Sequence, residues 1–426
     1  MKKMIAILAL LSLVVGFGFG QTAVKSAGGY KISALIGSAK WRDVYKDMAA
    51  AIKTDYNIDV DFQVIPDEQY DTLVKVKLAS GEVPDLIMGN IRSSQVTFNA
   101  EKNLVDLSKE PWVSRLTNAK LLTDANGRIF GQPVESSSFF GACYYNKKVF
   151  ADLGLKEPTT YAEFLKLLDT IKTKGKGITP FYASDKDTWT TQIFMTLGFS
   201  VAMYPKDGDI YQKLLTNKLK FTDVPEFKSI LSDWVDLYKK GYVNKDHVSA
   251  TYEMAKEAVA TGKAAMMLNG EWAAADIMAK WPDTQLGAFI IPFANKQIMG
   301  TGAFVRGYFI PSASKNVANA KDFLNIWSQP KYQNLFYKDL PGYPGFKDVD
   351  GGKVLPAVKG LVDNYISTGK NTYELNGPLQ EAGPVLSDFW GYYVELSMGS
   401  KTPDQVLAGM QKKFADFMKS KQMPGF

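Results

Sequence analysis

The amino-acid sequence predicts an α/β fold made of two lobes, and three features of its pattern lead to that prediction. Short apolar strand patterns alternate with amphipathic helical patterns between residues 30 and 90, which is typical of βαβ units around a mostly parallel sheet. A second strand–helix series begins at Gly141, and strand patterns return at residues 287–293 and 302–311. With 426 residues, the chain is long enough for two or three domains.

The first series predicts strands at residues 30–37, 60–66 and 81–90. The helical pattern of residues 39–56 fills the first gap between them, and a helix that begins at Asp67 fills the second. Each helical pattern has apolar residues at a spacing of three or four, so one face of each helix should cover the sheet.

The second series begins with a strand at residues 141–146 that leads into a short helix, followed by an amphipathic helix over residues 158–175. Helical patterns dominate from there to about residue 261, and the Pro- and Gly-rich segment 339–346 predicts a late crossing between the lobes. We therefore expect two discontinuous lobes, a first lobe of residues 29–136 plus 292–338 and a second lobe of residues 137–291 plus 339–426.

The N-terminus predicts a secretory signal over residues 1–20. Lys2 and Lys3 precede an apolar run over residues 4–15, and small residues follow up to Gly20. The alternative, a membrane anchor, would need an apolar stretch of about 20 residues. The lone Cys143 excludes an internal disulfide, and no cysteine near the signal could carry a lipid. We expect an exported, soluble periplasmic protein.

The charge pattern and the single histidine exclude several functions. The formal net charge of +6 falls to +4 without Lys2 and Lys3, and no basic block indicates nucleic-acid binding. His247 has no cysteine or histidine companions for a metal site and no nucleophile motif nearby, so we expect it at the surface. We expect no cofactor, no metal and no catalytic residues, and therefore no enzyme.

The segment 261–272, TGKAAMMLNGEW, places a tryptophan at a strand–helix junction. The apolar residues 264–268 lead through Asn269-Gly270 to Trp272, where an alanine-rich helix begins. In open α/β sheets, ligands lie outside the carboxyl ends of the strands. Trp272 therefore either faces a ligand cleft or packs as the first core residue of its helix.

Four segments in order carry a resemblance to a known family: residues 80–90, 131–165, 261–272 and 310–330. Together they resemble the extracellular solute-binding proteins of carbohydrate ABC importers, the maltose-binding-protein-like class. The resemblance implies the periplasmic binding protein type II fold, with two hinged lobes that bind a sugar in the cleft between them. The abundance of aromatic residues favours an oligosaccharide over a monosaccharide. It also implies a monomer that delivers the sugar to the permease subunits of an ABC transporter in the membrane.

The resemblance implies ligand-binding residues at strand ends and in loops on both sides of the cleft. These are Ser38, Lys40, Trp41, Asn90, Arg92, Glu135, Ser136, Asp187, Trp189, Glu271, Trp272, Arg306 and Trp390. For Glu135 the alternative is a solvated or salt-bridged glutamate, and for Arg306 it is a surface ion pair. The chain differs from maltose-binding protein in length and in most contact residues, so maltose itself is not implied.

Two alternative functions remain open at this stage. A secreted glycoside hydrolase also needs aromatic residues and only two carboxylates, and the chain has 44 aspartates and glutamates. The same fold could also bind a non-sugar solute, although Tyr144-Tyr145 lies in the wrong part of the chain for a ferric-ion site and the basic balance disfavours a polyamine. Hinged lobes favour binding over catalysis.

Overall fold

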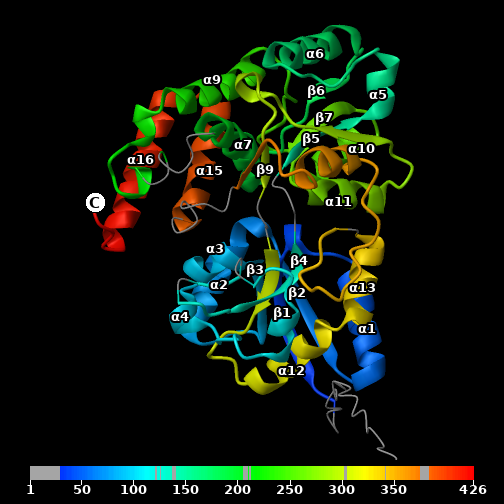
Figure 1. Cartoon of the computed structure of the whole chain (residues 1–426), viewed down its shortest axis with the longest axis vertical. Helices are drawn as coiled ribbons and strands as arrows, with labels where there is room; N and C mark the ends of the chain where they lie inside the picture. Colours follow the sequence, from blue (N-terminus) through cyan, green and yellow to red (C-terminus); the bar gives the residue numbers. More distant parts are fainter. Residues whose placement is uncertain are drawn as a thin grey trace, which may run out of the picture.

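The computed structural model folds the chain into two α/β lobes, one above the other in Figure 1. The structure describes residues 29–119, 122–124, 126–136, 141–204, 210, 213–301, 305–340, 342–374 and 383–426. Over these ranges, none of the helices is both long and apolar enough to cross a bilayer.

The first lobe is built on a five-stranded sheet. Its strands lie in the order β2 (Asp59–Ile65), β1 (Lys31–Gly37), β3 (Leu86–Asn90), β10 (Val305–Phe309) and β4 (Gly131–Ser136). The pairs β1–β2 and β1–β3 are parallel, whereas β10 runs antiparallel to both of its neighbours. Strand β10 belongs to a late segment of the chain that inserts between two early strands.

Helices cover both faces of this sheet (Figure 1). Helices α2, α3 and α4 lie on one side and α1, α12 and α13 on the other. Their bounds are α1 (Val44–Tyr56), α2 (Asp67–Ser80), α3 (Ile91–Thr97), α4 (Ala100–Asn103), α12 (Val317–Trp327) and α13 (Pro330–Asp339), with short 3-10 turns at Ser38–Lys40 and Pro111–Arg115. Tyr45 of α1 stacks on Phe336 of α13 at 5.8 Å, which joins the early and late segments in one core.

The second lobe is built on a four-stranded sheet. Its order is β6 (Thr179–Phe181), β7 (Ala264–Asn269), β5 (Ala142–Asn146) and β8 (Leu286–Phe289). Only β6 and β7 are parallel, because β5 runs antiparallel to both β7 and β8. A separate parallel pair joins β9 (Met299–Thr301) to β11 (Thr372–Glu374).

The helices of the second lobe surround this sheet and extend from it to the C-terminus (Figure 1). Thr160 begins α6 with a capping box to Glu163, as a helix start after a Pro-Thr-Thr segment predicts. The bounds are α5 (Lys147–Asp152), α6 (Tyr161–Lys174), α7 (Gln192–Met203), α9 (Pro225–Lys239), α10 (Tyr252–Ala260), α11 (Trp272–Lys280), α14 (Lys359–Leu361), α15 (Gly383–Ser397) and α16 (Pro403–Ser420).

The predicted two-lobed α/β fold is confirmed, with two corrections of detail. Both sheets are mixed and not mostly parallel, because strands such as β5 and β10 enter a sheet directly after crossing from the other lobe. Two crossings lie later than predicted: Ile298 and Met299 pack in the second lobe, and Phe346 and Val349 pack in the first. Apolar burial of these segments, and not their Pro and Gly content, determines where the chain crosses.

Candidate ligand-binding site

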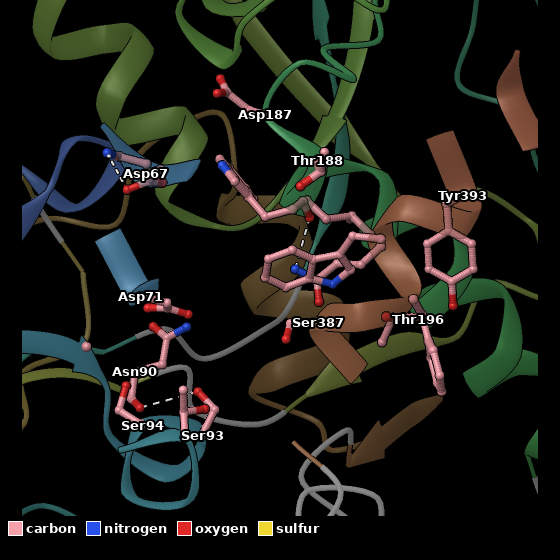
Figure 2. A pocket seen from close by; sticks show the side chains of 18 of the residues that line it. Asp67, Asp71, Asn90, Ser93, Ser94, Asp187, Thr188, Thr196, Ser387 and Tyr393 are labelled. Carbon is pink, nitrogen blue, oxygen red and sulfur yellow. Dashed lines mark hydrogen bonds between the residues drawn. The ribbon is translucent and has the colours of Figure 1, made fainter. Parts of the chain in front are cut away.

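A cavity of about 550 Å³ lies between the two lobes. Residues from strand ends and helix starts of both lobes line it, and Figure 2 shows several of them facing the same space. The polar and aromatic lining residues are Lys40, Asp67, Glu68, Asp71, Lys75, Asn90, Arg92, Ser93, Ser94, Thr97 and Arg306 from the first lobe and Lys186, Asp187, Thr188, Trp189, Gln192, Thr196, Phe199, Phe221, Phe227, Trp272, Ser387, Phe389, Trp390 and Tyr393 from the second.

The first-lobe wall consists of helix starts that directly follow strands. Strand β2 leads into α2, whose first two turns carry Asp67 and Asp71, and β3 ends at Asn90, where α3 begins. The Asp67 carboxylate accepts a hydrogen bond from the Ala39 N–H at 3.2 Å and lies 3.9 Å from the Lys40 ammonium. Asn90 makes no side-chain capping bond to α3, so its amide is not used by the helix start that it precedes.

Arg306 lies beside Asn90 in the sheet and points across to the second lobe. The register pairs Arg306 with Asn90 on one side and with Glu135 on the other, and a bulge follows between Arg306 and Gly307. A β-bulge changes the direction of the side chains next to it. The guanidinium lies 5.2 Å from the centre of the Trp272 ring and is 9% exposed, so Arg306 is not the exposed surface arginine that the alternative reading described.

Trp272 lies at the start of α11, and a glycine determines how its ring packs. A Cβ atom added to Gly270 would lie 2.1 Å from Cη2 of the Trp272 indole, a distance that no real contact reaches. The ring therefore folds back across the end of β7, over Gly270. This arrangement explains the segment Asn-Gly-Glu-Trp: the strand ends, the glycine leaves room, and the indole covers the junction on the cavity side.

The loop after Ala183 brings Asp187 and Trp189 into the same wall. The Tyr252 N–H donates a hydrogen bond of 2.6 Å to the Asp187 carboxylate, and the Tyr252 ring meets Trp189 edge to face at 5.3 Å. Trp189 and Trp272 lie 6.2 Å apart with their rings inclined at 50°. The two indoles thus form adjacent faces of one aromatic surface.

Burial is the largest influence on the pKa of the Asp187 carboxyl group. Desolvation raises the pKa of this carboxyl group, and the nearby carboxylates of Asp67 and Glu68 raise it further across the cavity, while the hydrogen bond from Tyr252 and the charge of Lys186 lower it. A carboxylate in this position is a strong acceptor for a ligand hydroxyl, because few water molecules compete for it.

Asp185 holds in place the loop that carries Asp187 and Trp189. Its buried carboxylate accepts hydrogen bonds from Ser397 Oγ at 2.8 Å and from Tyr238, and it pairs with His247 Nδ1 at 2.7 Å. His247 is only 14% exposed and is part of this network, so the predicted surface histidine is wrong. The anchoring matters for the site because Ser397 lies in α15, which carries another wall of the cavity.

Helix α15 supplies Ser387 and Tyr393, which are labelled in Figure 2, and also Trp390. In the described part of the chain, the indole N–H groups of Trp189 and Trp390 have no hydrogen-bond partner. The lining of the second lobe also includes the apolar residues Met203, Phe227 and Met410. The arrangement provides flat aromatic surfaces beside carboxylates and amides, and within the described ranges no cluster of three or more His, Cys, Asp or Glu is placed to hold a metal ion.

Of the thirteen predicted ligand-binding residues, eight line this cavity: Lys40, Asn90, Arg92, Asp187, Trp189, Trp272, Arg306 and Trp390. Ser38, Trp41 and Glu271 do not. Trp41 packs against Tyr45 and Phe62 because the next strand presents an apolar residue to it, and the Ser38 hydroxyl accepts the Asp67 N–H at the start of α2. Glu135 and Ser136 belong to β4, but their side chains lie outside the described residues.

Several residues that line the cavity were not predicted from the sequence. The first two turns of α2 contribute Asp67, Glu68 and Asp71, α3 adds Ser93, and α15 adds Ser387 and Tyr393. A usable signal existed for α2, because it directly follows a predicted strand, as Asn90 and Trp272 do. For Ser387 and Tyr393 there was no local signal, since α15 reaches the cavity only through the packing of the C-terminal helices.

This chain resembles known solute-binding proteins in sequence, and two of these are named as sugar-binding. A family model described as bacterial extracellular solute-binding protein matches residues 47–359. The chain is 28% identical over 322 residues to the multiple sugar-binding protein of Streptococcus mutans, covering 71% of this chain and 69% of that protein. It is 24% identical over 305 residues to the melibiose/raffinose/stachyose-binding protein of Bacillus subtilis, covering 68% and 67%.

Among solved structures, the fold is similar to that of a sugar transporter protein of Bacillus licheniformis in complex with stachyose. The TM-score is 0.73 at 20% identity, and the match covers 90% of this chain and all of that one. Identity at this level supports the shared two-lobed fold and leaves the ligand to the residues of the cavity.

Proposed function

From the premise that this chain belongs to the bacterial extracellular solute-binding proteins, we propose that it binds a short oligosaccharide in the cavity between its lobes. The observation that carries this proposal is the pair of inclined indoles, Trp189 and Trp272, next to the Asp187 carboxylate. A sugar ring has an apolar face of C–H groups and a rim of hydroxyls. Indoles cover the first, and carboxylates and amides bind the second.

The size of the cavity favours an oligosaccharide over a monosaccharide. Cavities that enclose a drug-sized molecule have volumes of about 300–1,000 Å³, and this one has about 550 Å³. Trp390 on α15 provides a further aromatic surface beyond the Trp189–Trp272 pair. Several stacking surfaces along one cavity suit several linked sugar rings, and the names of the Streptococcus mutans and Bacillus subtilis relatives support a carbohydrate.

The mechanism that we propose is binding and release without chemical conversion of the sugar. Ligand contacts one lobe first, and its contacts with the other lobe stabilise the closed arrangement, because a ligand shifts such an equilibrium only by its differential affinity for the two states. A shift from mostly open to mostly closed requires about 5.5 kcal/mol of differential affinity. The protein then acts as an exported, periplasmic monomer that presents the sugar to the permease of an ABC importer.

The test is a titration of the purified protein with melibiose, raffinose and stachyose, followed by intrinsic tryptophan fluorescence. Each sugar is recovered and analysed after the titration. Saturable binding with intact sugar supports the proposal. Cleavage of the sugar would instead indicate a glycoside hydrolase, and the absence of binding across a wide carbohydrate panel would contradict carbohydrate binding and direct the search to other solutes.

A further inference from the structure

A buried ion pair joins the two lobes beside the cavity. Nη2 of Arg42, in the segment that leads into α1 of the first lobe, lies 3.4 Å from Oδ1 of Asp276, on α11 of the second lobe. The two side chains are only 9% and 6% exposed. Because its two partners belong to different lobes, this pair can form only while the lobes keep this relative position.

Each partner is also held in place by its own lobe. Nη1 of Arg42 donates hydrogen bonds to the carbonyl oxygens of Ala39 at 3.1 Å and Trp41 at 2.9 Å. The Tyr252 hydroxyl donates a hydrogen bond of 2.9 Å to Oδ2 of Asp276. A buried ion pair overcomes the cost of desolvation only when further hydrogen bonds satisfy its remaining atoms, and both partners have such bonds here.

Tyr252 connects this pair to the cavity. Its backbone N–H donates to the Asp187 carboxylate at 2.6 Å, and its ring meets Trp189 edge to face at 5.3 Å. One tyrosine therefore contacts two cavity residues and the second-lobe partner of the ion pair. Neither Arg42 nor Asp276 lines the cavity itself.

We propose that Arg42 and Asp276 form an interlobe latch that stabilises the closed arrangement, and that Tyr252 couples the latch to ligand bound at Asp187 and Trp189. The coupling part rests on the proposed function, since its ligand is the carbohydrate of the cavity. The latch determines the fraction of protein molecules that are in the closed arrangement and able to hold the ligand. Because apparent affinity scales with the competent fraction, loss of the latch weakens binding without removing a ligand contact.

The closed fraction can be measured directly by single-molecule energy transfer. Val76 in the first lobe is 59% exposed and Met398 in the second is 58% exposed, so Val76→Cys and Met398→Cys provide dye positions on both lobes. The native Cys143 is fully buried and does not compete for the dyes. In this labelled background, transfer efficiency is recorded without sugar and across a stachyose titration.

Three variants test the latch, and a fourth serves as the matched control. Arg42→Gln and Asp276→Asn each remove one charge from opposite lobes, and Tyr252→Phe removes only the hydroxyl that bonds Asp276. The control, Arg115→Gln, breaks an arginine–aspartate pair that lies within the first lobe, with Arg115 Nε 2.8 Å from Asp348.

We expect Arg42→Gln and Asp276→Asn each to lower the closed-to-open ratio by about tenfold and Tyr252→Phe by about threefold. Stachyose affinity should fall by the same factors, and the double variant Arg42→Gln/Asp276→Asn should lose no more than either single one. The control should match the wild type. Asp276→Asn leaves the Arg42 hydrogen bonds to Ala39 and Trp41 in place. An effect of this variant therefore comes from the lost ion pair and not from a local change in the cavity wall around Ala39.

The latch is refuted if both charge variants keep the closed-to-open ratio and the affinity of the Arg115→Gln control. If the wild type binds no carbohydrate, the proposed function fails, and the ratio measured without sugar then decides the latch alone. Thermal unfolding of each variant identifies any loss of folding, and Arg42→Lys, which keeps the charge, should recover part of the closed fraction in a folded protein.

Discussion

The two walls of the cavity differ in chemistry, and the difference indicates a division of labour. The second-lobe wall contributes Trp189, Trp272 and Trp390, whereas the described first-lobe wall contributes no aromatic side chain and instead carries carboxylates, amides and cations such as Asp71, Asn90 and Arg306. Aromatic surfaces accept the C–H face of almost any sugar, while polar groups distinguish the positions of hydroxyls. The aromatic wall should therefore determine affinity and the polar wall selectivity.

The largest effect should come from the aromatic wall. Replacing Trp272 with alanine should weaken oligosaccharide binding more than about tenfold, because a large stacking surface and its contact with Arg306 are lost. Isothermal titration calorimetry with each sugar measures this. All sugars that bind should lose affinity by a similar factor, since the indole does not read hydroxyl positions.

Trp281→Ala is the matched control for this variant. Trp281 directly follows the same helix, α11, and is packed against Lys280 away from the cavity. Its replacement should leave affinity unchanged. A folded Trp272→Ala protein with the affinity of Trp281→Ala would show that the indole does not stack on the ligand.

Asp187 is the carboxylate that the described second-lobe residues contribute to the aromatic wall, and its replacement should have the next largest effect. Asp187→Asn keeps the acceptor for the Tyr252 N–H but removes the charge, so sugar affinity should fall about tenfold, the range for hydrogen bonds to charged groups.

Burial raises the pKa of Asp187. The wild type should therefore lose affinity on acidification at a higher pH than an ordinary carboxylate would produce, and Asp187→Asn should lack that loss. Equal pH profiles would contradict this.

The polar wall of the first lobe should show a smaller and more selective effect. Asn90→Ala removes an amide that makes no capping bond to α3, so the fold should be retained. We expect affinity to fall about threefold to fivefold, the value of a neutral hydrogen bond, and only for sugars with a hydroxyl within reach of the amide. The ratio of affinities for raffinose and stachyose should change, in contrast to Trp272→Ala. A uniform loss across sugars would remove the proposed division between the walls.

The sequence predicted the parts of the site where the signal is local. Trp272 directly follows the end of a predicted strand, and the change from strand to helix pattern marks that position, whereas Asn90 and Asp187 were expected from the family resemblance. Trp41 also follows a strand, but Phe62 of the neighbouring strand provides an apolar partner that no local pattern reveals. Strand direction in β5 and β10 was missed for a similar reason: it depends on which lobe the chain has just left.

The smallest effect is expected at a carboxylate outside the cavity, which provides a comparison for Asp187. Burial raises the pKa of Asp233, on α9, to about 6, and repulsion from Asp236 adds to this. The folded state therefore binds more protons than the unfolded state between the ordinary value of 3.8 and about 6, so stability falls as pH rises through this window.

Above this window the charged, partly buried carboxylate destabilises the fold to its full extent, and Asp233→Asn should stabilise the protein at pH 7 by about 1 kcal/mol after allowance for partial exposure. Thermal unfolding at pH 7 and pH 4 should show this gain only at pH 7, with sugar affinity unchanged at both. Both carboxyl groups have raised pKa values, but of the two only Asp187 faces the cavity. A loss of sugar affinity in Asp233→Asn would therefore show that position in the cavity does not distinguish a carboxylate that contacts the ligand from one that is only buried in the fold.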